Sequence, residues 1–186
     1  MLLSLIQAGV LNVSTLARLQ QLTQDSQCDA LTHTPNRNIM QDRIQQAISS
    51  SKRQSKHFAV LFIDLDNFKP VNDRYGHAAG DQVLQQVTER LTQTIRDSDT
   101  LSRYGGDEFL VLLPEVAHRE DVRAIAEKMG KVLAEVYAID GHQIRLSASI
   151  GMAVFPEDGT DVSSLVQQAD SAMYCAKSKG GGTFCG

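Results

Sequence analysis

The chain has 186 residues, enough for one sizeable hydrophobic core and too few for two typical domains. Hydrophobic residues make up 42% of it and charged residues 22%, which are ordinary values for a folded protein and exclude extensive disorder. The formal net charge of -4 excludes a general attraction to nucleic-acid backbones or anionic membranes, so a polyanionic ligand has to be held by local groups.

Residues 1–28 are interpreted as a helical appendage, either a linker or a dimer helix, ahead of one domain over residues 29–186. A helix packed on its own domain is the alternative. The opening stretch is shorter than the ~18 continuous apolar residues of a membrane span. Cys28, Cys175 and Cys185 lack Cys-x-x-Cys spacing, which argues against a disulfide framework or a zinc site. We therefore expect a cytoplasmic location, as a separate protein or as the cytoplasmic part of a longer membrane-bound sensor.

The first apolar patterns of the domain predict a helix and a strand. The helix is predicted over residues 36–51, after a Thr-Pro-Asn start signal. Residues 58–63 form a continuous apolar run of strand length, which predicts a central strand buried on both faces. This run ends at Asp64, so a carboxylate is expected at the edge of the core.

The rest of the chain predicts one hairpin, three more helices and a further strand. Gly105-Gly106 separates two predicted strands and supplies the positive φ angles of a tight hairpin turn. Apolar residues at helical spacing mark the helices, and an alternating pattern before a proline marks the last strand or hairpin. The ranges are 81–95, 122–136 and 162–176 for the helices, 100–104 and 109–113 for the hairpin strands, and 144–155 for the last strand.

This order of elements indicates an α+β fold in which helices flank an antiparallel central sheet, and we expect them on one face. Polymerases and class III nucleotide cyclases share this palm-like architecture. In this architecture the strand that ends at Asp64 lies antiparallel beside the strand that begins at Asp107. The end of the first is then next to the start of the second, so Asp64, Asp107 and Glu108 are expected to converge. Clustered carboxylates repel one another unless a cation neutralises them, and hard oxygen ligands suit Mg²⁺. The pattern indicates metal-assisted phosphoryl or nucleotidyl transfer, with solvated turn residues as the alternative.

Several short motifs follow one another between residue 29 and about residue 177. They are Asp29-Ala30-Leu31-Thr32, Asp64-x-Asp66-x-Phe68-Lys69, Asn72 with Gly76-His77 and Gly80-Asp81, and Arg103-Tyr104-Gly105-Gly106-Asp107-Glu108-Phe109. In these motifs the chain resembles the GGDEF-domain diguanylate cyclases, which join two GTP molecules into cyclic di-GMP. Several motifs in the correct order are far more specific than any single short pattern.

The resemblance implies a metal site at the converging acids. By it, Asp64 and Asp107 ligate Mg²⁺ (or Mn²⁺) with the help of the Leu65 carbonyl, and Glu108 lies near the reacting hydroxyl or a second metal. Asp64, Asp107 and Glu108 are then the catalytic residues.

The resemblance also implies a substrate site. Asn72 and Asp81 are implied as the guanine readers, since an ionised carboxylate can accept hydrogen bonds from both the ring N–H and the exocyclic amine of guanine, a pattern that adenine lacks. Lys69 and Lys177 are implied to meet the triphosphate, and the glycine pair to let the backbone approach the ligand closely. The substrate-binding residues are in this way Phe68, Lys69, Asn72, Asp81, Gly105, Gly106 and Lys177.

Two positions depart from the family pattern. Thr34 stands where an apolar side chain is expected near the guanine, which predicts weaker base stacking. Gly180–Gly182 stands where Gly-Arg-Asn is usual, so the arginine expected near the phosphates is missing. A lower affinity for GTP is expected, since a charge-assisted contact is lost.

The implied reaction needs two domains face to face, because each domain holds one GTP. A homodimer is therefore expected, and an upstream sensory domain would act by reorienting its two halves. Arg96-x-x-Asp99 matches the family's product-inhibition site, which makes cyclic di-GMP an expected allosteric ligand. No nucleic-acid partner is expected, because the acidic chain shows no basic groove or aromatic platform. A weak or inactive module that senses GTP or cyclic di-GMP is the alternative, although all three acids are retained.

Overall fold

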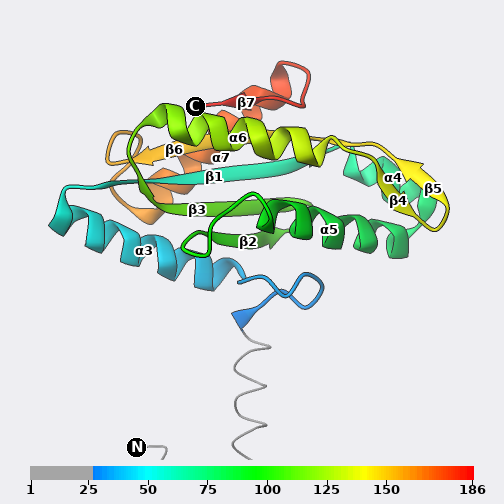
Figure 1. The fold of residues 1–186 in the computed structure, drawn as a ribbon, viewed down its shortest axis with the longest axis horizontal. Helices are drawn as coiled ribbons and strands as arrows, with labels where there is room; N and C mark the ends of the chain where they lie inside the picture. Colours follow the sequence, from blue (N-terminus) through cyan, green and yellow to red (C-terminus); the bar gives the residue numbers. More distant parts are fainter. Residues whose placement is uncertain (1–26) are drawn as a thin grey trace, which may run out of the picture.

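The computed structural model describes residues 27–186, in which one sheet lies between two layers of helices (Figure 1). In chain order the elements are α3 (Arg37–Gln54), β1 (His57–Asp66), α4 (Phe68–Tyr75), α5 (His77–Thr92), β2 (Thr100–Gly105), β3 (Glu108–Val116), α6 (Arg119–Leu133), β4 (Tyr137–Ile139), β5 (His142–Ile144), β6 (Ser147–Phe155), α7 (Val162–Ser178) and β7 (Phe184–Cys185). The predicted appendage over residues 1–28 lies outside the described residues, apart from its last two.

The five-stranded sheet has the order β2-β3-β1-β6-β7, and β4 and β5 form a separate hairpin. All neighbouring strands are antiparallel except β6 and β7, which run parallel, so the sheet is mixed. β1 lies in the centre, and nine of its ten residues are buried. The α+β class and the doubly buried central strand that the sequence predicts are confirmed.

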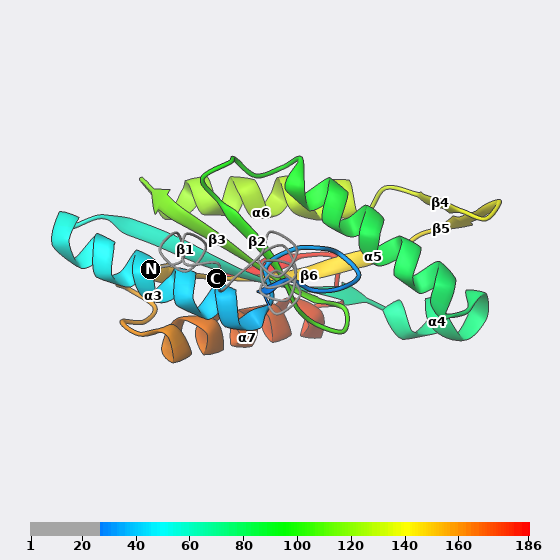
Figure 2. The same cartoon turned by 90° about the horizontal axis from the view of Figure 1, so that it is seen from below.

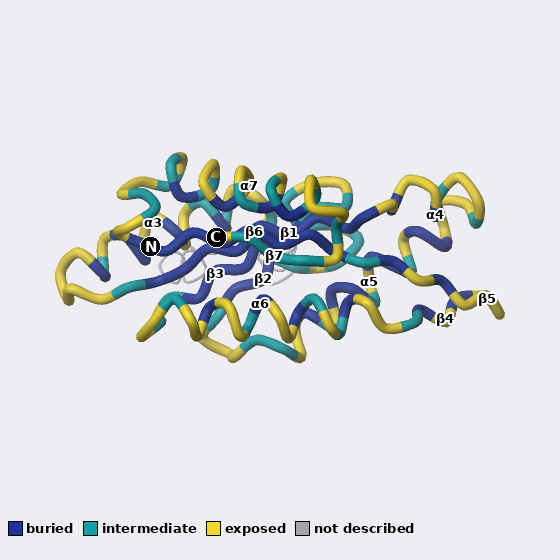
Figure 3. The backbone as a smooth tube through the Cα atoms, turned by 90° about the horizontal axis from the view of Figure 1, so that it is seen from above, coloured by how far each residue is buried: buried dark blue, intermediate teal, exposed yellow. Residues whose placement is uncertain are grey.

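The expectation that the helices lie on one face of the sheet is wrong. Figures 2 and 3 show α5 and α6 on one side of the sheet and α3 and α7 on the other. Alternate residues of β1 point to opposite faces, so each face presents an apolar surface that only a helix layer can bury. Ala59, Leu61 and Ile63 pack in the core with α5 and α6, and Phe58, Val60 and Phe62 in the core with α3 and α7.

The predicted glycine hairpin is confirmed, because β2 pairs antiparallel with β3 across the turn. Only Gly106 of the glycine pair has a positive φ, of 53°, while Gly105 ends β2. The predicted helices are present with shifted ends. The sequence analysis missed α4, β7 and the β4–β5 hairpin. No helix within the described residues is long and apolar enough to cross a membrane.

Candidate active site

The three acidic residues that the sequence predicts to converge lie at adjoining positions of β1 and of the turn that begins β3. In the β1–β3 pairing, Asp64 lies opposite Glu108. One residue further along β1, the backbone N–H of Leu65 donates a hydrogen bond of 3.3 Å to the carbonyl of Asp107. The two strands therefore fix these acidic residues through the backbone, and the site is part of the rigid sheet.

Lys177 reaches this cluster from α7. Its Nζ lies 2.7 Å from Oδ1 of Asp64, whose side chain is only 10% exposed. Burial raises the pKa of Asp64 above its usual range, although the lysine opposes this shift. Burial acts to lower the pKa of Lys177, but contact with Asp64 and nearby acids outweighs it and raises that pKa. The lysine thus stays charged and partly balances the acids.

The cluster keeps an excess of negative charge. Burial, and then repulsion from Asp64 and Asp107, raise the pKa of Glu108 above its usual range. Such a surplus favours the binding of a cation. Apart from the ion pair with Lys177, the buried Oδ1 of Asp64 forms no hydrogen bond with the described residues. This atom fits a metal ligand, since a carboxylate oxygen in that setting has no other strong partner.

The protein supplies only part of a metal's coordination shell. Within residues 27–186, no three His, Cys, Asp or Glu side chains gather closely enough to form a complete metal site. Mg²⁺ is usually held by one or two carboxylates together with substrate phosphates and water. The Asp64 and Asp107 carboxylates and the Leu65 carbonyl fit that pattern, in which a nucleotide completes the shell.

A cavity of about 340 Å³ opens beside Asp107. Its wall includes five of the predicted substrate residues, which come from α4, α5 and the glycine turn. A Cβ on Gly80 would lie 1.9 Å from Oδ1 of Asn72, so this glycine lets α4 and α5 meet closely at the cavity. The lining residues are Phe68, Lys69, Asn72, His77, Asp81, Leu84, Arg103, Gly106 and Asp107.

A second and larger cavity, of about 700 Å³, lies on the α3 and α7 side of the sheet. Glu108 and Asp170 contribute carboxylates to it, and Arg37 lies over the ring of Tyr104, 4.5 Å from its centroid. Neighbouring acids of the hairpin thus face different cavities, with Asp107 on the smaller and Glu108 on the larger one.

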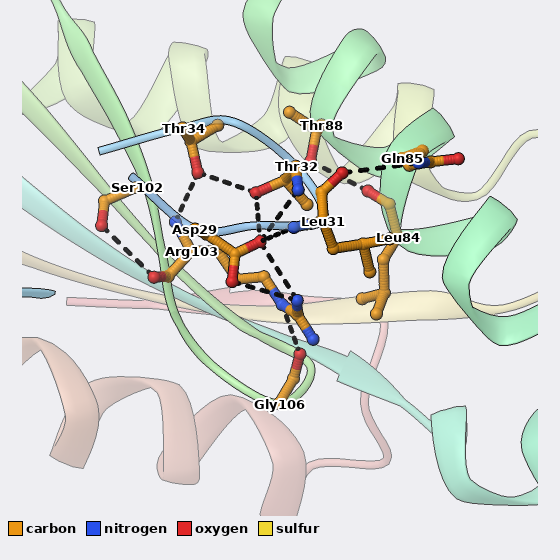
Figure 4. Close-up of polar contacts among 10 residues, drawn as sticks. All are labelled: Asp29, Leu31, Thr32, Thr34, Leu84, Gln85, Thr88, Ser102, Arg103 and Gly106. Carbon is orange, nitrogen blue, oxygen red and sulfur yellow. Dashed lines mark hydrogen bonds and ion pairs between the residues drawn. The ribbon is translucent and has the colours of Figure 1, made fainter. Parts of the chain in front are cut away.

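The first described residues are bound to the glycine turn (Figure 4). Nη1 of Arg103 lies 3.2 Å from both carboxylate oxygens of Asp29, and its Nε donates a 2.9 Å hydrogen bond to the carbonyl of Gly106. Thr34 accepts a 3.0 Å hydrogen bond from the backbone N–H of Arg103. Thr34 does not line the smaller cavity, where Leu84 supplies the apolar wall instead.

Family membership follows from the comparison with known proteins. The family model described as diguanylate cyclase, GGDEF domain, matches residues 26–183. The chain belongs to the GGDEF family. It is 45% identical over 177 residues to the bifunctional diguanylate cyclase/cyclic di-GMP phosphodiesterase MucR of Pseudomonas aeruginosa, across 95% of this chain and 26% of MucR. The chain therefore spans about a quarter of the length of that relative.

Solved structures of the GGDEF family have the same fold. The GGDEF domain of YfiN (TpbB) from Pseudomonas aeruginosa is similar with a TM-score of 0.80 and 39% identity, over 82% of this chain and 95% of that chain. The chain spans 40% of the curated TpbB sequence. A microbial GGDEF domain, described with its interaction with cyclic di-GMP, has a TM-score of 0.75 and 32% identity, over 88% of this chain and 98% of that chain.

Asp66 is a residue of this GGDEF domain whose role the sequence analysis missed. Its carboxylate accepts hydrogen bonds from the hydroxyls of Ser147 and Ser149, at 2.6 and 2.8 Å, and from the backbone N–H of Gly182, at 2.7 Å. Gly181 has a φ of +73°, and a Cβ there would lie 2.8 Å from Oδ2 of Asp66. The glycine run that replaces the family's arginine is therefore packed against Asp66.

The predicted product-inhibition residues form a tight turn ahead of β2. The backbone N–H of Arg96 donates a 2.9 Å hydrogen bond to the carboxylate of Asp99, and the N–H of Asp99 donates one of 3.0 Å to the carbonyl of Arg96. Both residues line a cavity of about 490 Å³ together with Arg43. This cavity lies at the start of β2, whereas the glycine turn lies at its end.

Proposed function

We propose that this GGDEF domain is a diguanylate cyclase, which condenses two GTP molecules into cyclic di-GMP and releases two pyrophosphates. One observation carries the proposal: Asp107, which adjoins Asp64 and Glu108 across the β1–β3 pairing, lines the same cavity as Asn72 and Asp81. The proposed guanine readers therefore share a cavity with Asp107, one of the proposed metal ligands. Since GTP is a cytoplasmic nucleotide, we place the reaction in the cytoplasm.

In the proposed complex the guanine occupies the smaller cavity. Asp81 accepts from the ring N–H and the exocyclic amine, and Asn72 adds polar contacts to the base edge. Phe68 and Leu84 supply apolar walls, and Lys69, which also lines the cavity, would contact the phosphates. The backbone of Gly105 and Gly106 passes close to the ligand, where a side chain would obstruct it.

The phosphates then lie at the acidic cluster. A bound Mg²⁺ or Mn²⁺ would supply charge neutralisation and polarisation of the α-phosphate there. The cation and Lys177 would compete for the Asp64 carboxylate. Lys177 would therefore leave Asp64 and contact the triphosphate instead. Glu108 faces the larger cavity, where it can hold or accept the proton of an attacking hydroxyl.

Two chains are needed for one product molecule. The 3′-hydroxyl of each GTP attacks the α-phosphate of the other, and pyrophosphate leaves from each. The proposed homodimer supplies the orientation of the two nucleotides. Bound product would act at Arg96 and Asp99, with Arg43 as a second guanidinium in the same cavity.

The test is synthesis of cyclic di-GMP and pyrophosphate by the purified chain with GTP and Mg²⁺. We expect Asp64→Asn and Asp107→Asn each to lower the rate by about 100-fold or more, because an amide is a much poorer Mg²⁺ ligand than a carboxylate. The matched control is Asp73→Asn, an exposed acid of α4 that lines neither cavity of the site.

Wild-type rates in either site variant would refute the metal assignment. GTP binding without any product in the wild type would favour the alternative, a module that senses nucleotide. The retention of all three acids argues for turnover.

A further inference from the structure

Two cysteine thiols lie side by side at the end of the chain. Sγ of Cys175, in α7, is 3.2 Å from Sγ of Cys185, in β7. Both side chains are half-buried, and Cys28 is the third cysteine of the described residues. β7 pairs with β6, with Cys185 opposite Gly151, so the sheet holds this thiol in place (the red strand in Figure 1). Both sulfurs are therefore positioned by regular secondary structure.

A lysine contacts one of these thiols. Nζ of Lys179 lies 3.1 Å from Sγ of Cys185. Partial burial acts to raise the pKa of Cys185, but hydrogen bonds with Cys175 and Lys179 outweigh it and lower that pKa below its usual range. A partly accessible thiol with a lowered pKa, next to a second thiol, is the arrangement of redox-sensitive cysteine pairs.

We propose that Cys175 and Cys185 form a reversible disulfide that fastens β7 to the end of α7. The oxidant is a peroxide. The thiolate of Cys185 attacks one peroxide oxygen and becomes a sulfenic acid, while the other oxygen leaves as hydroxide and takes a proton to form water. The thiol of Cys175 then attacks that sulfur, and a second water leaves with the thiol proton. Two thiols and one hydrogen peroxide thus give one disulfide and two waters.

The disulfide closes a short loop that contains Lys177 and the glycine run. Lys177 pairs with Asp64 from this loop, and Gly182 is hydrogen-bonded to Asp66. Oxidation would fix both ends of the segment that carries these contacts. The inference concerns thiol chemistry and does not require the proposed cyclase activity.

The site of the disulfide can be read by peptide mapping. The reduced wild-type chain is treated with hydrogen peroxide, its free thiols are alkylated in denaturant, and it is digested with trypsin. Trypsin cuts after Lys177 and Lys179, between the two cysteines, so the disulfide joins peptide 146–177 to peptide 180–186. We expect this linked pair in monomeric chains, with Cys28 alkylated, and its loss after dithiothreitol.

Variants separate the pair from other thiol reactions. Cys28→Ser should oxidise like the wild type, and Cys185→Ser should give no linked pair. Closing the loop should raise Tm by roughly 5–10 °C in the wild type and not in Cys185→Ser. Lys179→Gln should slow thiol loss several-fold, because the thiolate loses its cation. Lys128→Gln, on the exposed face of α6, is the matched control and should change nothing.

The proposal is overturned by any of three results. These are a disulfide that joins two chains or involves Cys28, a Cys185 that oxidises only to sulfinic acid, or equal thiol-loss rates in Lys179→Gln and Lys128→Gln.

Discussion

At the scale of single residues, Lys177 and a divalent cation would compete for the same carboxylate. The Asp64 oxygen that Lys177 contacts is buried, and burial raises the pKa of that acid. If a divalent cation were bound with the nucleotide, the Asp64 and Asp107 carboxylates would hold it and Lys177 would be free to contact the phosphates. In the proposed site the Asp64 carboxylate would therefore have a positively charged partner both with and without bound nucleotide.

Asp81 is expected to select the base. Asp81→Ala leaves two guanine donors without an acceptor, at a cost of ~1–3 kcal/mol, so GTP affinity should fall by about 5- to 150-fold. Titration calorimetry with GTP and with ATP measures this, and Asp73→Ala is the control on the exposed side of α4. A wild-type chain that binds ATP as tightly as GTP would contradict the role of Asp81.

Asp29 is expected to stabilise the fold only while it is charged. Burial acts to raise its pKa, but hydrogen bonds from Thr32 and Arg103 outweigh it and lower that pKa. The pKa of Asp29 is thus lower in the folded chain than the usual ~3.9 of an unfolded chain. Its charge stabilises the fold fully at pH values above ~3.9, and this contribution is lost as the pH falls through the lowered pKa.

Asp29→Asn should therefore cost ~0.5–1 kcal/mol near pH 7, after allowance for solvent screening. The difference between variant and wild type should shrink below about pH 4. Urea unfolding over this pH range measures it. A difference that persists undiminished in acid would show that the charge of Asp29 is not its cause.

At the scale of elements, the packing of α7 on β6 depends on one glycine. A Cβ on Gly151 would lie 2.0 Å from the carbonyl oxygen of Ala169 and 2.1 Å from the backbone nitrogen of Met173. These are backbone atoms of α7 and cannot rotate away, so the helix would have to move off the sheet.

Gly151→Ala should therefore destabilise the fold by about 3 kcal/mol and weaken nucleotide binding, since α7 carries Lys177. Gly130→Ala in α6 is the opposite case, because its Cβ would meet nothing within 4 Å. That change should stabilise the fold by ~0.5–1 kcal/mol. Thermal unfolding of both variants measures these changes in stability. A Gly151→Ala protein as stable as the wild type would exclude the close contact.

The elements that the sequence predicts well are those with strong local patterns. The β1 run and the glycine hairpin need no knowledge of distant residues. The sequence of a helix does not show which face of the sheet the helix covers. Its apolar stripe shows only which side of the helix is buried. α4 buries only Phe68 and Val71, and β7 has two residues, so neither produces a recognisable period.

In the candidate site, too, the residues in local motifs were predicted and those that depend on distant parts of the chain were not. Asp64, Asp107, Asn72 and Asp81 were predicted from short motifs, and the fold brings them together. Asp66 was missed because its partners lie 81 to 116 residues away along the chain. Leu84 was missed because it belongs to the same apolar stripe as the core residues of α5, and only the fold shows that it also lines a cavity.

At the scale of the whole molecule, β2 connects the proposed product-inhibition residues with the proposed active site. The turn of Arg96 and Asp99 precedes this strand, and the glycine turn with Asp107 follows it. A product molecule that bridges two domains at the first turn would hold them apart at the second. A coupling of ~1–3 kcal/mol is enough for such inhibition.

Arg96→Ala should therefore remove inhibition by added cyclic di-GMP and leave the initial rate without product unchanged. The measurement is an initial-rate series with increasing cyclic di-GMP for wild type and variant. Arg53→Ala, an exposed arginine in the last turn of α3, is the control and should be inhibited like the wild type. Equal inhibition of wild type and Arg96→Ala, or none in the wild type, would exclude this site.

The attachment of Asp29 also has a mechanical consequence. Asp29, near the start of the described residues, accepts hydrogen bonds from the guanidinium of Arg103. The same guanidinium donates a hydrogen bond to the carbonyl of Gly106, the residue before Asp107. The planar guanidinium holds its partners in a more defined geometry than a flexible side chain with a single hydrogen bond. We therefore expect a rotation of the backbone at Asp29 to be passed through Arg103 to the glycine turn, and so to the position of Asp107.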